Sequence, residues 1–422
     1  MKGKYSRSVL KAIDLIWTSF NREEMRQGYM MLVEAARKGD ADALCFIARC
    51  HMGEEYVWSG AGFDEDDKNA SLLMQKSALM GSASGVLCAV RSGNFTPAVE
   101  QGMPFASFKE AYEEILEQAK RGNAFCQYMI GNVYFWEDYY LVEPDLVEKY
   151  KTREEYHAFA YPIARQFYEA SFKGRLSMGF GNYRTLFKEG YVDRETYENY
   201  FQQLANISPC VCSSFGTYLE DTYKNYEEAA SYAIKAVQMG DARSAYNTGT
   251  YYDRGKGVEQ DFDMAFRFYE IAAMAGEAKA QWQVGYFYFE AWGSVKRDYA
   301  KAVQWFRKAF EQSDGECDEW AAAYLAVCCQ NGLGTVQDDE EAFDFLCYIE
   351  DVDELWDDLA AKVLNAYGVA YAYGRGAEKD IQLGIEYFDD AIARGSKEAK
   401  KHRKHFRQDD NGEWYYVEKK AK

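Results

Sequence analysis

The 422-residue sequence contains little proline, with five residues, and little histidine, with four. Proline breaks the interior of a helix. With only five prolines, long stretches of the chain are free to be helical. The sequence also lacks an apolar run long enough to cross a membrane. Its basic start, Met1 to Lys4, is followed by a stretch that Lys11 and Asp14 interrupt, which is a poor signal-peptide core. We therefore predict a cytoplasmic protein that does not insert into a membrane.

Motifs of catalytic and cofactor chemistry are missing as well. There is no phosphate loop and no Gly-x-Ser-x-Gly elbow. The ten cysteines never form Cys-x-x-Cys, which favours buried, reduced thiols. His402 and His405 could share a helix face, but two ligands do not complete a tetrahedral zinc site. The acidic run 338–358 fails as a calcium loop, because Phe343 stands where glycine is needed. We predict no catalytic residue, no cofactor and no metal site.

The charge balance restricts the partners. Asp and Glu number 68 against 49 Lys and Arg, which gives a net charge of −19 and a pI near 4.8. A nucleic-acid footprint needs the opposite sign, so we expect no nucleic-acid partner. Near the C-terminus the basic residues gather, which is typical of a terminal helix with a polar outer face, although a head-to-tail contact with the acidic run is an alternative. These basic residues are Lys397, Lys400, Lys401, Arg403, Lys404 and Arg407.

The feature that the chain does have is one motif, repeated. Its template is Ala-x-x-φ-φ-x-x-Ala-Ala-x-x-Gly, where φ is large and apolar. The clearest copies end at Gly240 and Gly276, 36 residues apart, and a fixed period of that size indicates a repeat array. The spacing places the apolar residues on one helix stripe, and we predict that the glycine ends the helix at a positive φ. The other glycine anchors of the series are Gly39, Gly81, Gly122, Gly174 and Gly395.

A second helix is predicted after each anchor. It carries a small residue nine positions on, Gly249 or Gly285 in the clearest copies, which we expect to let two helices approach closely as a hairpin. The loop that follows supplies glycines for a turn and then an aspartate, which is a good cap for the next helix. These predicted caps are Asp261, Asp298, Asp338 and Asp380.

These units resemble Sel-one-like repeats, a branch of the tetratricopeptide-like helical repeats. The resemblance is most specific between Tyr226 and Gly395. It implies an all-α, right-handed superhelical solenoid, and the repeats counted in this sequence make it about nine or ten hairpins long. The turn signal at 410–412 and the run 413–417 predict a short strand-like cap at the C-terminus. The predicted domains are a capping helix in 1–22, the repeat array in 23–395, and a basic last helix with a strand-like tail in 396–422. The family also implies an adaptor without catalytic activity of its own.

By the same resemblance, the first helix of each repeat lines a concave face. Its exposed positions should lie 2, 6, 10 and 13 residues before the anchor, and in the fourth and fifth units these positions are aromatic. We predict that a partner protein or peptide binds there, unless the winding of the array buries these rings. A rival prediction is an acidic inhibitor or immunity-type protein that neutralises a basic enzyme, and the oligomeric state stays open. The predicted groove residues are Tyr161, Tyr168, Phe172, Tyr197, Phe201 and Phe266.

Overall fold

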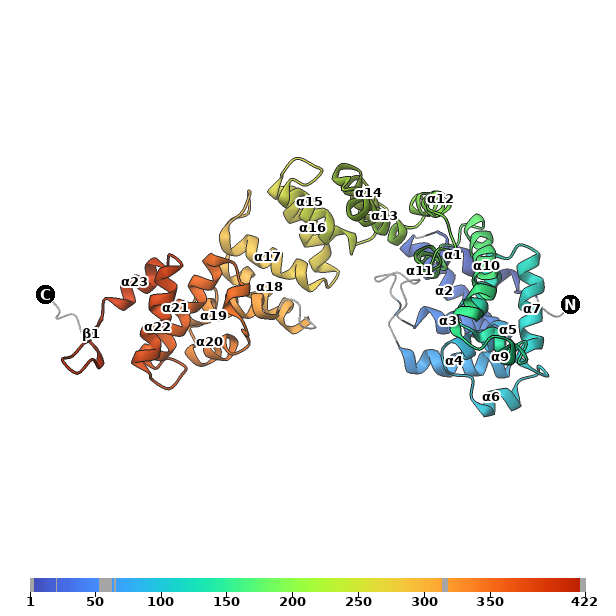
Figure 1. Ribbon diagram of the computed structural model, residues 1–422, viewed down its shortest axis with the longest axis horizontal. Coiled ribbons are helices and arrows are strands. Elements are labelled where there is room, and N and C mark those ends of the chain that lie inside the picture. The colour runs from blue at the N-terminus through green and yellow to red at the C-terminus, as the bar shows by residue number, and fades with distance from the viewer. Residues whose placement is uncertain (1–3, 20, 53–62, 64–65, 313–317, 418–422) are drawn as a thin grey trace. The chain divides into compact units, whose positions relative to one another are not determined.

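A computed structural model of the chain describes residues 4–19, 21–52, 63, 66–312 and 318–417. The chain divides into two compact units, residues 1–241 and 242–422. Both units are built of helices, and helices that follow one another along the chain pack side by side within each unit (Figure 1). The fold is therefore an all-α array of helical hairpins, as predicted.

The first unit begins with α1 (Arg7–Trp17), which packs against α2 (Arg22–Arg37) through an apolar face that includes Val9, Ile13 and Ile16. A helix is thus present within the range 1–22, where the capping helix is predicted. The remaining described elements of this unit are α3 (Ala41–Cys50), α4 (Asp67–Leu79), α5 (Ala83–Arg91), α6 (Pro97–Gly102), α7 (Phe108–Lys120), α8 (Ala124–Phe135), η1 (Asp138–Leu141), α9 (Leu146–Lys149), α10 (Arg153–Lys173), α11 (Phe180–Lys188), α12 (Arg194–Ala205), α13 (Pro209–Tyr223) and α14 (Tyr226–Gln238).

The second unit is more regular, and it ends in a small sheet. Among the described residues, no helix of either unit combines the length and the apolar content that crossing a bilayer requires. The described elements of this unit are α15 (Ser244–Arg254), α16 (Phe262–Met274), α17 (Ala278–Glu290), α18 (Tyr299–Gln312), α19 (Asp318–Asn331), α20 (Asp339–Leu346), η2 (Val352–Glu354), α21 (Asp357–Tyr373), α22 (Ile381–Ala393), α23 (Lys397–Arg403), β1 (Phe406–Gln408) and β2 (Trp414–Tyr416).

Aspartate caps begin the first helix of the regular repeats. The Asp261 carboxylate accepts hydrogen bonds from the backbone N–H groups of Asp263 and Met264, both at 2.9 Å. Such a cap satisfies donors that the first helical turn leaves unpaired. The equivalent residues Asp298, Asp338 and Asp380 accept from the backbone in the same way, so the four predicted caps are confirmed.

Left-handed glycines end these helices. Gly276 has φ +95°, its N–H donates to Ala273, and the next N–H donates to Ala272, a pairing that closes the last turn. Gly240 has φ +100°, and Gly395 has φ +93°. The prediction of a positive φ is therefore confirmed for Gly240 and Gly276. Besides Gly240, three further anchors of the first unit share this geometry, with φ of +89°, +94° and +91°: they are Gly39, Gly81 and Gly122.

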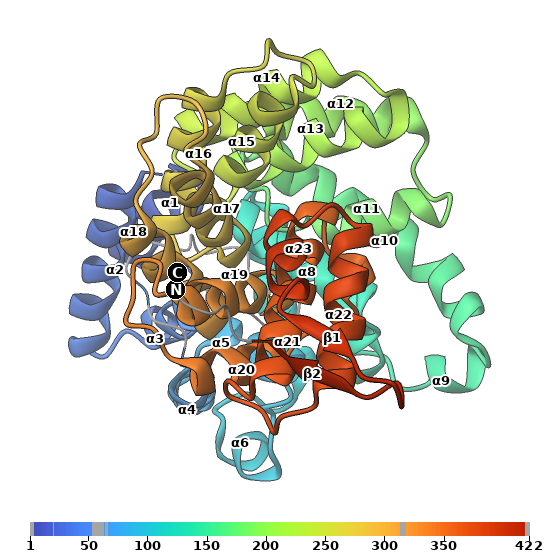
Figure 2. The same cartoon turned by 90° about the vertical axis from the view of Figure 1, so that its left-hand side faces the viewer.

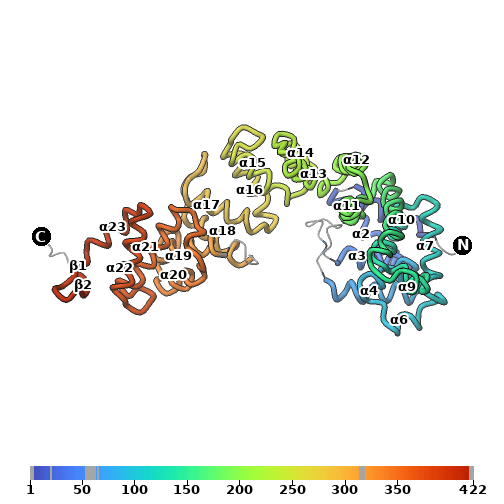
Figure 3. The backbone as a smooth tube through the Cα atoms, in the orientation of Figure 1, coloured from blue at the N-terminus to red at the C-terminus, as the bar shows by residue number. Residues whose placement is uncertain are grey.

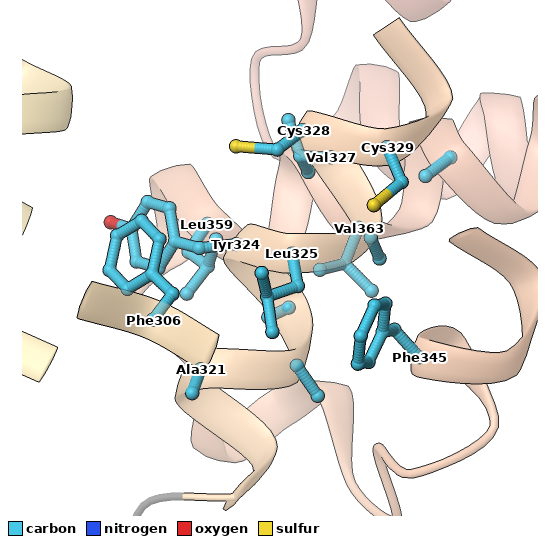
Figure 4. Packing of buried hydrophobic residues seen from close by; sticks show 14 of the residues in the cluster. Phe306, Ala321, Tyr324, Leu325, Val327, Cys328, Cys329, Phe345, Leu359 and Val363 are labelled. Atoms are coloured by element: carbon cyan, nitrogen blue, oxygen red, sulfur yellow. The ribbon is translucent and has the colours of Figure 1, made fainter. Parts of the chain in front are cut away.

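The small residue of the second helix has a different role from the one predicted. A Cβ on Gly285 would lie 2.7 Å from the ring of Phe306, which belongs to the first helix of the next repeat. Gly249 meets the ring of Tyr269 at the same distance. These glycines therefore make room chiefly for an aromatic ring of the following repeat. Beyond this contact the core continues, and the ring of Phe306 stacks on Tyr324 with centroids 4.8 Å apart (Figure 4).

The chain ends in the predicted strand-like cap. β1 and β2 pair antiparallel, with Phe406 opposite Tyr416, across a turn in which Gly412 has φ +86°. Phe406 is fully buried and packs on the rings of Phe388 and Tyr373, and β2 contacts α22. The hairpin thus follows α23 at the end of the second unit (Figures 2 and 3).

Candidate functional site

Five of the six aromatic residues of the predicted groove are buried in the core. Tyr168 is fully buried, and the four residues Tyr161, Phe172, Tyr197 and Phe201 are between 1% and 5% exposed. The expectation that they form an exposed partner-binding stripe is wrong. Phe266, the sixth residue of the prediction, is half-buried on α16 and packs against the rings of Phe287 and Tyr288.

In the fourth repeat the error is one residue of register. Gly174 has φ −80°, and the left-handed residue is Arg175, with φ +64°. Arg175 donates its N–H to Phe172, as Gly276 does to Ala273. Counted from Arg175, Tyr168 lies seven residues before the anchor, where Tyr269 lies relative to Gly276. One residue is about 100° around a helix, which moves a ring from the surface to the core.

The fifth repeat shifts in the same direction for another reason. The connection after α12 contains no left-handed residue, and Ser208 donates its N–H to Leu204. This connection and the one at Gly276 each have three residues between their helices, so the two turns differ in backbone conformation and not in length. In this repeat Tyr197 and Phe201 pack against Phe180, with ring centroids 5.7 and 4.5 Å away.

Tyr168 also has a polar role within the core. Its hydroxyl donates to Asn132 Oδ1 at 2.8 Å, and Asn182 donates to the same two oxygens at 3.0 Å. Its ring fills the space left by Gly131, because a Cβ there would lie 2.7 Å from the ring. Tyr168 is thus a structural residue of the first unit.

The two histidines of the sequence analysis contribute to packing at the C-terminus. His402 stacks on Phe388 with centroids 5.5 Å apart, and burial lowers the pKa of its imidazole. His405 stacks on Tyr416 at 5.9 Å. Among the described residues, no three His, Cys, Asp or Glu side chains gather in a way that could hold a metal ion.

The acidic run 338–358 is partly neutralised by cations from elsewhere in the second unit. Arg375 pairs with Asp339 at 2.6 Å, and Lys362 pairs with both Asp358 and Glu290. Burial alone would lower the pKa of Lys362, but hydrogen bonds to these two carboxylates raise it above its ordinary value. The ammonium group is therefore held charged between two acids.

A polar cavity of the first unit holds about 160 Å³ and is lined by residues that include Arg49, Arg91, Tyr128 and Asn132. Its volume is below the roughly 300–1,000 Å³ of common small-molecule sites. The Arg49 guanidinium packs over the Phe125 and Tyr128 rings, at 5.4 and 5.7 Å. The cavity has the character of a packing space with polar walls.

The second unit carries an exposed aromatic group that the sequence analysis missed. Trp356 is 47% exposed, and its ring lies 5.3 Å from Trp282, 5.3 Å from Tyr286 and 4.7 Å from Trp320. We call these four residues the Trp356 cluster. Trp282 and Tyr286 are one turn apart on α17, Trp320 is on α19, and Trp356 immediately precedes α21.

Local backbone geometry places Trp356 on the surface. Leu355 and Trp356 are extended, so their side chains point to opposite sides. Leu355 is 4% exposed and enters the core, which turns Trp356 outward onto α17 and α19. Trp282 and Tyr286 lie four residues apart on α17, and this spacing can be recognised in the sequence. Their contact with Trp356, which lies beyond the next repeat, cannot be recognised there.

Comparison with protein families supplies the identification. The model of the family described as Sel1 repeat matches residues 204–241, 242–277, 278–314, 321–347 and 361–396. This chain carries Sel1 repeats. The matched ranges contain the anchors Gly240, Gly276 and Gly395. They do not contain Gly39, Gly81 or Gly122, although the same left-handed turn occurs at these three positions.

Two curated proteins of fungi are similar to parts of the chain. Chitin synthase regulator SKT5 of Malassezia restricta is 32% identical over 118 residues, which cover 28% of this chain and 8% of that protein. An uncharacterized Sel1-like repeat-containing protein of Schizosaccharomyces pombe is 27% identical over 157 residues, which cover 33% of this chain and 23% of that protein. The chain thus matches less than a quarter of the length of either relative.

Two solved structures are also similar. A Sel1 repeat protein from Oxalobacter formigenes matches 52% of this chain and 86% of its own, with 25% identity and a TM-score of 0.38. A protective antigen of uropathogenic Escherichia coli strains, described as displaying an SLR fold, matches 95% of this chain and 87% of its own, with 20% identity and a TM-score of 0.47.

Proposed function

We propose that the chain is a non-catalytic scaffold of the cytoplasm that binds a partner protein or peptide on an exposed face of its repeats. Sel1-repeat proteins generally mediate protein–protein interactions. The observation that carries the proposal here is the Trp356 cluster, in which Trp356 is exposed, Tyr286 and Trp320 are half-buried and Trp282 is buried, because an exposed aromatic surface marks an interaction site. When a partner buries aromatic side chains of this kind, they contribute most of the binding energy of the interface.

The name of one relative supports a regulatory rather than a catalytic role. That protein is called a regulator of an enzyme, and the similarity lies in a small part of it. A scaffold regulates other proteins by holding them. In this chain the apolar positions of the repeat template pack between its own helices, as expected for a scaffold.

Affinity capture with the tagged full chain, followed by mass spectrometry at about 0.1 M and about 0.5 M salt, tests this proposal. A scaffold that grips through aromatic side chains keeps its partner at the higher salt concentration. An acidic inhibitor held by charge alone loses its basic target there. Capture of no protein at either salt concentration contradicts the scaffold.

A further inference from the structure

The surroundings of the Trp356 cluster are strongly acidic. Between Ala309 and Ala361 the sequence has sixteen Asp and Glu residues and no Lys or Arg. Trp320 and Trp356 both lie in this segment, each beside carboxylates. Asp357 and Asp358 directly follow Trp356, and their side chains are 96% and 82% exposed.

Ion pairs near the Trp356 cluster show which chemical groups this surface binds. The Lys362 ammonium group lies 3.0 Å from Glu290 Oε1, pairs with Asp358 at 2.5 Å, and sits 5.6 Å from the centroid of the Phe289 ring. A cation is thus held here by two acids and an aromatic face. Arg394 pairs in a similar way with Asp353 and Asp357.

The cations that already pair with this segment do not balance it. In the part of the chain that the structure describes, four cations pair with carboxylates of this segment, against sixteen carboxylates in its sequence; the four are Arg307, Lys362, Arg375 and Arg394. The face therefore attracts cations and repels anions, at a range set by the salt concentration. An exposed tryptophan amid carboxylates is well suited to a guanidinium or ammonium group, which gains from both the ring face and the negative charge.

We propose that the Trp356 cluster binds an arginine- or lysine-bearing segment of a partner protein, with one cationic side chain over the exposed ring of Trp356 and beside Asp357 and Asp358. This deepens the proposed scaffold function and rests on it. Charge complementarity selects the occupant, since an acidic segment would be repelled and a purely apolar one would leave the carboxylates unused.

Fluorescence anisotropy of a labelled peptide with four Gly-Arg repeats, titrated with the full chain, tests this inference. We expect saturable binding of this peptide. The same peptide with citrulline in place of arginine keeps the shape but carries a carbonyl oxygen in place of one amino group and loses the charge, and it should bind at least tenfold more weakly. Equal binding of the two peptides overturns the proposal.

Two variants locate the site. Trp356→Ala and the double variant Asp357→Asn with Asp358→Asn should each weaken binding of the arginine peptide at least tenfold. The double variant removes charge without removing core packing, so it decides the matter if Trp356→Ala fails to fold. The matched control, Glu386→Gln with Asp390→Asn on α22, removes the same charge from the same unit and should change binding less than twofold. If the control weakens binding as much as the double variant, the attraction is general and the proposal fails.

A second copy of the chain is the competing occupant, because α23 is basic. Sedimentation velocity measures self-association of the chain. If the wild-type chain self-associates, and both the double variant Lys400→Gln with Lys401→Gln and the single variant Trp356→Ala abolish this assembly, the occupant is a second copy and the proposed partner segment is overturned. Affinity capture separates the two levels of the account. If the wild-type chain and Trp356→Ala capture the same partner equally, the proposed scaffold function is supported and the proposed binding site is wrong. If the wild-type chain captures no protein, the proposed scaffold function is wrong. The peptide titration still measures binding at the site in that case.

Discussion

Helices α10 and α16 end in the same turn, built from different residues. In α16 the turn uses Ala275 and then Gly276, with φ −83° and +95°. In α10 it uses Gly174 and then Arg175, with φ −80° and +64°. Arginine thus takes the left-handed position, which glycine adopts without penalty and other residues at a cost of about 1–2 kcal/mol. The turn is therefore kept while the residue that favours it has moved by one place.

Gly174 is required for a different reason than Gly276. A Cβ on Gly174 would lie 2.5 Å from the Cβ of Ala124 on α8, whereas one on Gly276 would be 3.9 Å from its nearest neighbour. Glycine at the first site allows close packing of two helices, and glycine at the second allows the backbone to reverse. A glycine at a repeat boundary can therefore have either of two functions, close packing or chain reversal. Which of the two it has determines the helix face on which the neighbouring side chains lie.

The largest effect expected from this comparison is at Tyr168. Because its ring fills the core of the first unit, Tyr168→Ala should lower the free energy of unfolding by roughly 3–5 kcal/mol. Tyr168→Phe keeps the ring but removes the hydroxyl, which donates to Asn132 and accepts from Asn182, and should lower it by about 1–2 kcal/mol. Urea denaturation followed by circular dichroism measures both.

The control for Tyr168 is Met274→Ala on α16, whose side chain is 76% exposed. It should change the free energy of unfolding by less than about 0.5 kcal/mol. A Tyr168→Ala variant as stable as Met274→Ala would mean that α10 presents this ring to solvent after all.

The next effect tests whether both units use the same contact between repeats. A Cβ on Gly131 would lie 2.7 Å from the Tyr168 ring, and one on Gly368 would lie 2.4 Å from the Phe388 ring. Gly131→Ala and Gly368→Ala should each destabilise by roughly 1–3 kcal/mol through overpacking. Thermal melts compare them with Gly181→Ala, which meets nothing within 4 Å and should not destabilise. Destabilisation in one unit only would show that the contact is not shared.

How much of this follows from sequence depends on the range of the interaction. The positive φ of Gly276 and the capping by Asp261 are local and were predicted correctly, since each depends on residues within one turn. The positions of Tyr161 and Tyr168 were not, because a single residue of register, decided by packing of Gly174 on Ala124, changes the face of α10. The Trp356 cluster needs three elements to meet, and no local pattern encodes that meeting.

A smaller effect concerns pH in the first unit. Burial raises the pKa of Asp42 from 3.8 to about 6, while its hydrogen bond from Ser82 opposes the shift. The folded state therefore binds a proton more tightly than the unfolded state between about pH 4 and pH 6, and stability falls as the pH rises through this window. Compared with Asp42→Asn, the wild-type chain should lose melting temperature from pH 4 to pH 6.5. A constant difference between the two proteins over that range would show that Asp42 is ionised like an exposed carboxylate.

The most direct test of the account is the unfolding free energy of Arg175→Gly beside that of Gly174→Ala, measured by urea denaturation of the full chain. The register described here predicts opposite signs. Arg175→Gly should stabilise by roughly 1 kcal/mol because it relieves a left-handed arginine. Gly174→Ala should destabilise by roughly 1–3 kcal/mol because its Cβ meets Ala124. If Arg175→Gly destabilises the chain and Gly174→Ala leaves it unchanged, Arg175 is not the anchor of α10, and the buried register of its aromatic residues is wrong.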